Sequence, residues 1–222
     1  MSSGHKIDVM KFQILCKDTA KMCKEPGRYV DNLPATDVII CFHNEAWSVL
    51  LRTVHSVLVR SPPHLINEII LVDDFSDMPH TKQQLEDYFS AYPKVKILRA
   101  LSREGLIRAR LLGARYAKAP VITYLDSHCE CTEGECVRND LYVWASWLEP
   151  LLDRIARNST TVVCTVIDVI DDTTLEFHYR DSGGVNVGGF DWNLKFNWHA
   201  VPERERKRHK LGILYPFTLN TA

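Results

Sequence analysis

The sequence predicts an α/β protein built on a mostly parallel sheet. Four short apolar runs, each long enough for one strand, alternate with segments in which apolar residues recur at helical spacing. This alternation is typical of βαβ units, in which a crossover helix joins two parallel strands. With 222 residues the chain has the length of one domain with a core of ordinary size.

The expected elements follow one another in a regular order. We expect helices after the first, second and third strands, and Pro62-Pro63 ends the first helix before the second strand begins. The third helix carries Arg108, Arg110 and Arg115 between its apolar residues. The expected strands lie at 37–42, 68–72, 95–98 and 121–124, and the expected helices at 47–60, 82–89 and 106–118.

Acidic residues follow two of these strands. Asp73-Asp74 comes after the second strand, and the fourth runs into Asp126 and His128. Alternate residues of a strand point to the same side, so these two side chains are expected about 7 Å apart, both able to reach one cation. Ligands of open α/β sheets bind beyond the carboxyl ends of the strands. The pattern predicts a divalent metal held against a phosphorylated ligand.

Several of these residues also have a purely structural interpretation. Asp73-Asp74 fits an ordinary turn after a strand, because aspartate is favoured in turns. We interpret Arg110 and Arg115 as part of a solvated helix face and His43 as structural. Two tryptophans near the C-terminus, Trp192 and Trp198, fit either the core or an active-site groove.

Seven motifs, in the same order, strongly resemble those of the UDP-GalNAc:polypeptide N-acetylgalactosaminyltransferases. These enzymes begin mucin-type O-glycosylation, and the resemblance covers roughly residues 23–208. The motifs are IICFHNEAWS at 39–48, LRTV at 51–54, EIILVDD at 68–74, GLIRAR at 105–110, LDSHCEC at 125–131, WLEPLL at 147–152 and GGFDWNL at 188–194.

The resemblance implies a Rossmann-like glycosyltransferase A-type fold, incomplete at its C-terminus, that holds a metal-bound sugar nucleotide. Asp126 and His128 match two of the family's three protein ligands to Mn²⁺. A carboxylate and an imidazole suit this metal, with the diphosphate supplying further oxygens. The metal neutralises, as a Lewis acid, the charge that develops on the leaving UDP.

Four further residues are assigned to the UDP-sugar through the same resemblance. Asp74 matches the acid that contacts the uridine, and Arg103 matches an arginine that contacts the nucleotide. Cys41 stands where many members carry threonine or valine beside the uracil. Ser127, between the two metal ligands, is placed with them. No residue is assigned as a catalytic nucleophile.

The implied function is metal-dependent, retaining transfer of GalNAc from UDP-GalNAc to Ser or Thr hydroxyls of polypeptides, on the lumenal side of the Golgi. The alternative is a catalytically inactive UDP-binding fragment or isoform. A third hypothesis, a metal-dependent glycosyltransferase that uses another UDP-sugar, is disfavoured by the FHNE and GGFDW motifs. They match the polypeptide-modifying family.

Comparison with the family divides the chain into three parts. Residues 1–33 are expected to be an N-terminal extension, 34–208 the nucleotide-sugar-binding part with an insertion at 135–146, and 209–222 a divergent tail. The third metal ligand, the acceptor half and the lectin domain of the family have no counterpart in the sequence. We therefore expect this chain alone to transfer no GalNAc.

Composition and cysteine count add further limits. A net charge of −1 with 25% charged residues gives no basis for nucleic-acid binding. The sequence contains no apolar run of membrane-spanning length, about 18 residues, and no signal peptide at its start. Seven cysteines cannot all pair within the chain, and the resemblance implies that the partner of Cys23 lies in the missing half. Cys129 and Cys131 with His128 form an alternative zinc set.

Overall fold

The structure of the chain is a computed structural model. It describes residues 7–10, 29–131, 137–138, 141–142, 147–163, 167–171, 174, 177–178, 186–193, 195–200 and 203. The predictions for Cys23 and for the tail at 209–222 lie outside these residues, as do most of the extension at 1–33 and most of the insertion at 135–146.

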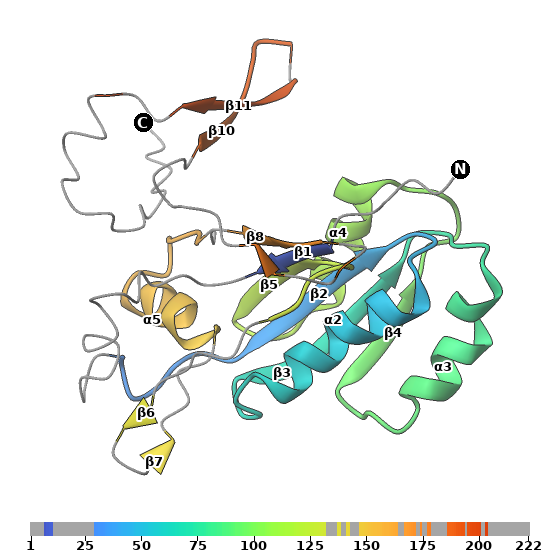
Figure 1. Cartoon of the computed structure of the whole chain (residues 1–222), viewed down its shortest axis with the longest axis horizontal. Coiled ribbons are helices and arrows are strands. Elements are labelled where there is room, and N and C mark those ends of the chain that lie inside the picture. The colour runs from blue at the N-terminus through green and yellow to red at the C-terminus, as the bar shows by residue number, and fades with distance from the viewer. Residues whose placement is uncertain are drawn as a thin grey trace.

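A four-stranded parallel sheet forms the centre of the described structure (Figure 1). Its order is β4-β3-β2-β5, so the first strand of the sheet in sequence lies between the second and the last. The expected α/β fold with a parallel sheet is confirmed. The strands are β2 (Thr36–Phe42), β3 (Ile66–Asp73), β4 (Val95–Arg99) and β5 (Val121–Asp126).

Helices cover both faces of the sheet, as the crossover connections require (Figure 1). Alternate β2 residues Val38 and Ile40 pack in the larger core cluster with α2 residues, while Ile39 belongs to a smaller cluster beneath α4. Each of these three side chains is fully buried. The helices are α2 (Trp47–Val59), α3 (Gln83–Phe89), α4 (Leu106–Tyr116) and α5 (Glu149–Arg157), with a 3₁₀ turn η1 (Pro79–Thr81) before α3.

Helix α4 approaches the sheet closely at Gly113. A Cβ atom on this residue would lie 2.6 Å from Cγ2 of Ile39 and 3.1 Å from Cγ2 of Val72. Both of these neighbours are fully buried in the sheet and cannot move away without disturbing other packing. Glycine is therefore required where the helix crosses β2 and β3, and the helix that follows Arg103 is fixed tightly against the sheet.

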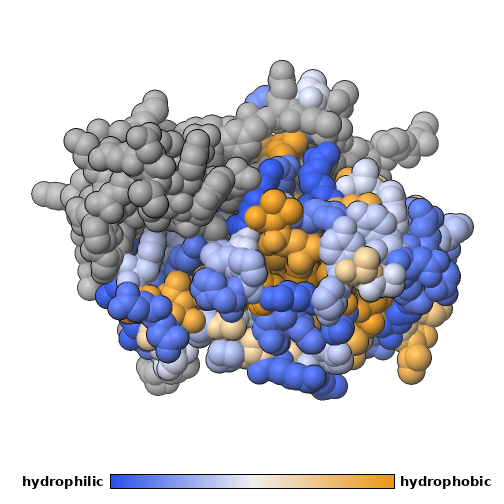
Figure 2. Space-filling view, turned by 90° about the horizontal axis from the view of Figure 1, so that it is seen from below, coloured by the Kyte–Doolittle hydropathy of each residue, from blue (hydrophilic) through white to orange (hydrophobic). Residues whose placement is uncertain are grey.

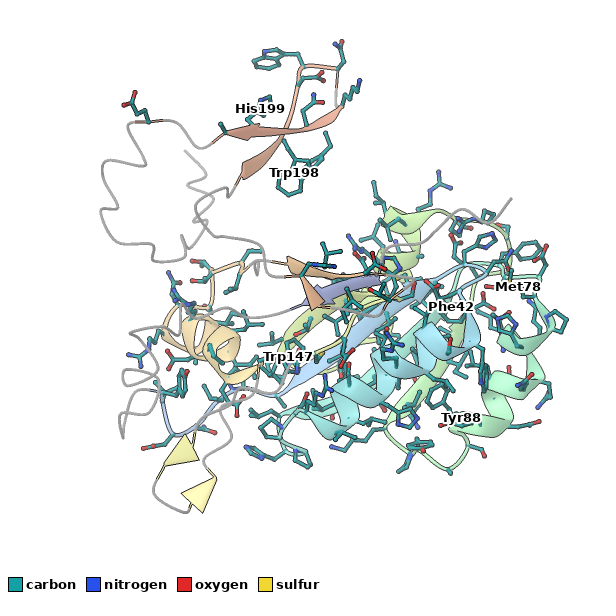
Figure 3. All side chains as sticks on the ribbon, viewed as in Figure 1. Phe42, Met78, Tyr88, Trp147, Trp198 and His199 are labelled. Atoms are coloured by element: carbon teal, nitrogen blue, oxygen red, sulfur yellow. The ribbon has the colours of Figure 1, made fainter. Side chains whose placement is uncertain are left out.

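Helix α5 is attached to the same core. Trp147, two residues before the helix, points inward between α5 and the sheet (Figure 3), and its indole Nε1 donates to Oγ of Ser61 at 3.0 Å. The helix residues Leu151 and Leu152 are buried in the larger cluster. The WLEP motif therefore anchors this helix through its aromatic and aliphatic side chains.

Smaller antiparallel pairings complete the described structure. A hairpin of β10 (Asn186–Phe190) and β11 (Phe196–Ala200) carries Trp192 and Trp198, whose side chains are exposed, so the core interpretation of these tryptophans is wrong. The remaining strands are β1 (Ile7–Met10), β8 (Ile167–Ile170) and β9 (Phe177–His178) in one sheet, and β6 (Val137–Arg138) paired with β7 (Leu141–Tyr142).

Some large apolar side chains of the described region are exposed to solvent. Figure 2 shows apolar side chains between hydrophilic ones on one face of the molecule. Among the described residues, α4 exposes Ile107 and Leu111, and β5 exposes Ile122 and Tyr124. None of the helices in the described ranges is long and apolar enough to cross a membrane.

The buried carboxylate of Asp37 links several segments at the amino-terminal edge of the sheet. Oδ1 of Asp37 accepts hydrogen bonds from Nδ2 of Asn67 at 2.8 Å and from the Glu68 amide at 3.0 Å. Its Oδ2 accepts from the amides of Lys118 at 2.6 Å and Ala119 at 2.8 Å. Burial raises the pKa of Asp37, but these four hydrogen bonds outweigh it and the pKa is lowered. Asp37 thus joins β2 to the start of β3 and to the segment that leads into β5.

We predict that Asp37→Asn lowers the free energy of unfolding at neutral pH by about 2 kcal/mol, because charged hydrogen bonds are replaced by a poorly matched amide. Because the folded-state pKa is lowered, the stabilisation from Asp37 is complete above the unfolded value of 3.8 and is lost as the pH falls below that value and through the lower folded-state pKa. Denaturant unfolding from pH 3 to 7 should therefore show a weaker acid dependence in the variant. Asp77→Asn, at an exposed position, is the matched control; equal effects of both would contradict the prediction.

Candidate functional site

The residues predicted to bind the ligand converge at the carboxyl edge of the sheet. The register places Cys41 of β2 between Val72 of β3 and Asp126 of β5. Asp74 directly follows β3, while Ser127 and His128 lie in the turn that follows β5. Arg103 approaches the same edge from the loop before α4, through its contact with Asp74. All six sequence-predicted site residues are therefore gathered at one edge.

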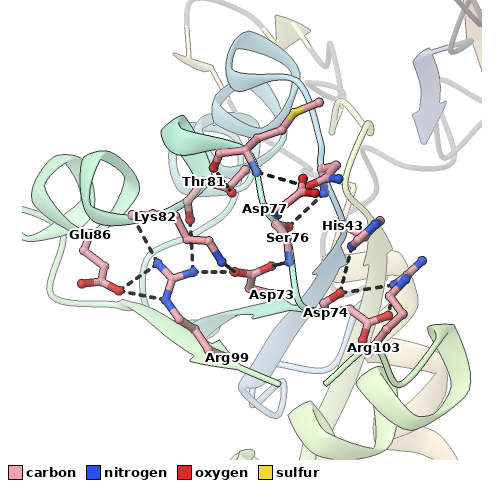
Figure 4. Close-up of polar contacts among 12 residues, drawn as sticks. His43, Asp73, Asp74, Ser76, Asp77, Thr81, Lys82, Glu86, Arg99 and Arg103 are labelled. Carbon is pink, nitrogen blue, oxygen red and sulfur yellow. Dashed lines mark hydrogen bonds and ion pairs between the residues drawn. The ribbon is translucent and has the colours of Figure 1, made fainter. Parts of the chain in front are cut away.

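Asp74 organises the loop that enters α4 (Figure 4). Its Oδ1 accepts from the Glu104 amide at 2.7 Å, and its Oδ2 accepts from the Gly105 amide at 2.9 Å and forms an ion pair with Nη1 of Arg103. His43 contacts the Asp74 carbonyl oxygen through Nδ1 at 2.9 Å, in agreement with a structural role for this histidine. Asp74 is buried whereas the Arg103 side chain is half exposed. The carboxylate therefore holds Arg103 in place at the mouth of the site.

The neighbouring carboxylate of Asp73 serves a different loop (Figure 4). It lies 2.5 Å from Nη1 of Arg99 and 3.9 Å from Nζ of Lys82, and it accepts from the Ser76 amide at 2.8 Å. Arg99 also pairs with Glu86 of α3 at 2.8 Å. Asp73 thus stabilises the segment between β3 and α3, which distinguishes it from Asp74.

Asp126 forms an ion pair that sequence reasoning missed. Nη2 of Arg110 on α4 lies 2.9 Å from Oδ1 of Asp126, and the same guanidinium lies 5.6 Å from the ring centre of Tyr124. The interpretation of Arg110 as part of a solvated helix face is therefore wrong, whereas Arg115 is exposed as expected. Arg110 stands in the GLIRAR motif, but only the packing of α4 against the sheet directs it to β5.

Ser127 and His128 are held by a second residue that sequence reasoning missed, Glu45. Its Oε2 accepts from Oγ of Ser127 at 2.5 Å and contacts Nδ1 of His128 at 3.2 Å. The Ser127 carbonyl in turn accepts from Oγ1 of Thr53 on α2 at 2.8 Å. Burial raises the pKa of Glu45, but the hydrogen bonds from His128, Ser127 and the Ala46 amide outweigh it and lower the pKa to about 2. Glu45 is thus a buried carboxylate at neutral pH.

The turn, rather than strand alternation, positions the Asp-x-His pair. Strand β5 ends at Asp126 and His128 lies in the turn that follows, so the two are not alternate residues of one strand as expected, and their convergence stays a prediction. Their neighbours differ accordingly, since Asp126 pairs with Arg110 of α4 and His128 contacts Glu45 in the loop before α2. Helix α4 and the loop before α2 therefore contribute the partners of this pair.

Comparison with known proteins identifies the family. The model of glycosyl transferase family 2 matches residues 37–219. The chain belongs to glycosyl transferase family 2. It is 76% identical over 187 residues to putative polypeptide N-acetylgalactosaminyltransferase 9 of Drosophila melanogaster, which covers 84% of this chain and 27% of the relative. It is 64% identical over 187 residues to polypeptide N-acetylgalactosaminyltransferase 5 of Caenorhabditis elegans, over 84% of this chain and 28% of that protein.

A solved structure agrees with these relatives. The crystal structure of GalNAc-T7 with UDP, GalNAc and Mn²⁺ superposes with a TM-score of 0.68 at 37% identity, covering 82% of this chain and 32% of that chain. The resemblance to polypeptide GalNAc-transferases is thus confirmed. This chain spans about a quarter to a third of the length of these proteins.

The cysteines of this family 2 domain do not form a metal site in the described region. The structure describes Cys41, Cys129 and Cys131, each as a thiol. Burial raises the pKa of Cys41 to about 11 and that of Cys131 to about 12, so both are neutral at physiological pH. No group of three or more potential metal ligands occurs within the described ranges. His128, Cys129 and Cys131 are therefore not grouped as a ligand set in that part of the chain, and the zinc alternative has no support there.

We predict that Asp74→Asn destabilises the entry to α4, because the amide cannot accept all three hydrogen bonds and loses the ion pair with Arg103. The free energy of unfolding should fall by about 1–2 kcal/mol, with faster hydrogen exchange at the Gly105 amide. Glu104→Gln serves as control, because it removes only an exposed pair with Arg108 at 3.3 Å, worth a few tenths of a kcal/mol. An Asp74 variant no less stable than this control would refute the role given to Asp74.

Proposed function

We propose that this domain binds UDP-GalNAc together with Mn²⁺ and supplies the sugar-nucleotide side of a polypeptide N-acetylgalactosaminyltransferase. The observation that carries the proposal is the gathering of Asp74, Arg103, Asp126 and His128 at one sheet edge, in a chain similar to a protein solved with UDP, GalNAc and Mn²⁺. The reaction would transfer GalNAc to a polypeptide, as the names of the relatives indicate, and the family resemblance implies a Ser or Thr hydroxyl as the acceptor.

The residues at the end of β5 fit a divalent cation. Asp126 offers a half-exposed carboxylate, and His128 has its Nδ1 engaged by Glu45, so a cation would be bound through Nε2. Metal-binding histidines commonly have their other ring nitrogen held by a carboxylate in this way. When bound, Mn²⁺ supplies Lewis-acid neutralisation of the charge on the UDP diphosphate.

Arg110 and Arg103 complete the electrostatics of the proposed site. Arg110 neutralises the charge of Asp126, and its ion pair at 2.9 Å would have to loosen when a cation binds the same carboxylate. Both guanidiniums carry positive charge at the edge where a diphosphate would lie, and arginine binds phosphate oxygens in a bidentate manner. We assign Arg103 to the nucleotide, positioned by Asp74. Cys41, as a neutral thiol, borders the nucleotide pocket together with Ser127.

The proposal includes the compartment of the reaction. On the strength of the family resemblance, we place the working protein on the lumenal side of the Golgi. The same environment would permit a disulfide at Cys23, as the family resemblance implies.

A second candidate function is UDP binding without sugar transfer. Within the part of the chain that the structure describes, Asp126 and His128 are two candidate metal ligands and no third one joins them. This incomplete set favours binding without transfer. A transfer assay with UDP-GalNAc, Mn²⁺ and a Ser/Thr-rich peptide separates the two. Product formed by the purified 222-residue chain would exclude the non-catalytic function, whereas binding without product would support it.

We predict that calorimetric titration of the chain shows UDP binding that depends on Mn²⁺. Asp126→Ala should weaken this binding by more than about tenfold, since even groups that only orient metal ligands have effects of this size. Asp87→Ala, at an exposed position on α3, should leave it unchanged. Binding of UDP that is equally tight with and without Mn²⁺, or in the Asp126 variant, would contradict the proposed site.

We also predict that Glu45 positions His128 rather than contacting the ligands. Glu45→Ala should weaken Mn²⁺ binding in the presence of UDP by about 10- to 100-fold, and Glu45→Gln, which retains an acceptor oxygen, by less. Manganese titration followed by electron paramagnetic resonance gives the affinity, and thermal unfolding reports any loss of folded protein. Manganese affinities of both variants equal to that of the unaltered chain would refute this positioning role.

A further inference from the structure

A single asparagine in this sequence stands in an N-glycosylation sequon. Asn158-Ser159-Thr160 has the pattern Asn-x-Thr with a residue other than proline in the middle. The chain has nine asparagines, and none of the other eight is followed two positions later by Ser or Thr. The sequon is not part of the residues gathered at the carboxyl edge of the sheet.

The structure places this sequon on the surface. Asn158 is the residue that ends α5, with an extended backbone, and Asn158, Ser159 and Thr160 are all exposed. Oδ1 of Asn158 accepts from the amide of Thr160 at 3.1 Å and from its hydroxyl at 2.8 Å. No contact described in this segment involves the amide nitrogen Nδ2, which is the atom that would carry a glycan.

Helix α5, which precedes the sequon, is held against the core by its buried side chains. Leu151 and Leu152 are buried in the core, and Asp153 accepts from the Val30 amide at 2.9 Å and from Nε of Arg157 at 2.8 Å. A glycan at Asn158 therefore extends into solvent from the end of an anchored helix. It displaces no buried side chain, so the folded domain tolerates the modification.

We propose that Asn158 is an N-glycosylation site of this protein. In the reaction, Nδ2 of Asn158 forms a bond to the anomeric carbon of a lipid-pyrophosphate-linked oligosaccharide supplied by the host's oligosaccharyltransferase. The bond from that carbon to the pyrophosphate oxygen breaks, the lipid pyrophosphate leaves, and the amide nitrogen loses one proton. The proposal rests on the proposed function only for the compartment, because the modifying enzyme acts in the lumen of the endoplasmic reticulum.

The test uses the whole 222-residue chain behind a cleavable signal sequence, expressed in insect cells, so that entry into the lumen does not depend on the proposed function. Intact mass before and after peptide N-glycosidase, and mass spectrometry of the peptide containing position 158, report the modification. Asn158→Gln and Thr160→Ala destroy the sequon. The matched controls Ser159→Ala and Thr160→Ser change neighbouring side chains but preserve it.

The expected result is one removable glycan per chain in the unaltered protein and in both controls, and none in Asn158→Gln or Thr160→Ala. Secreted chain without a glycan at position 158 would overturn the proposal, as would an unchanged glycan mass in Asn158→Gln. Manganese-dependent UDP binding is measured on the same samples. If the glycosylated chain shows no manganese-dependent UDP binding, the proposed function is refuted while the proposal for Asn158 is still supported.

Discussion

The parallel pairing of β2 with both β3 and β5 is the constraint on which the rest of this structure depends. It aligns Cys41 with Val72 on one side and Asp126 on the other, so residues that follow two different strands reach the same edge. Val38, Ile39 and Ile40 are buried whichever face they point to, and a shift of one residue would exchange the two packed faces. The register of one buried strand therefore determines which side chains can share a ligand.

The charged groups at this edge depend on that register for their partners. Four carboxylates lie close together there, and each has its own set of donors. Asp73 faces Arg99, Asp74 faces Arg103 and the start of α4, Asp126 faces Arg110, and Glu45 faces Ser127 and His128. Asp73, Asp74 and Glu45 secure loops, while Asp126, the most exposed of them, pairs with an arginine of α4.

Much of this could be predicted from the residues. Apolar runs 37–42, 68–72, 95–98 and 121–124 correspond to β2, β3, β4 and β5. The central strands β2 and β3 need such runs because they are buried on both faces, whereas the edge strand β5 exposes Ile122 and Tyr124. The three expected helices between them also formed, each within two residues of its predicted ends. Arg110 and Glu45 were not found as site residues, because an arginine on an amphipathic helix and a glutamate in a loop have no local pattern that distinguishes partners far away in sequence.

The sequence by itself determined the fold class and the family of this protein, and it singled out Asp74, Arg103, Asp126 and His128 as candidate binding residues, since apolar periodicity and contiguous motifs are local properties of the chain. The tertiary structure alone decided which groups hold these residues. Glu45 meets His128 across 83 positions and Asp74 meets Arg103 across 29. Such contacts depend on sheet register and on how closely α4 packs at Gly113, and these are set by the packing of the whole core rather than by any one segment.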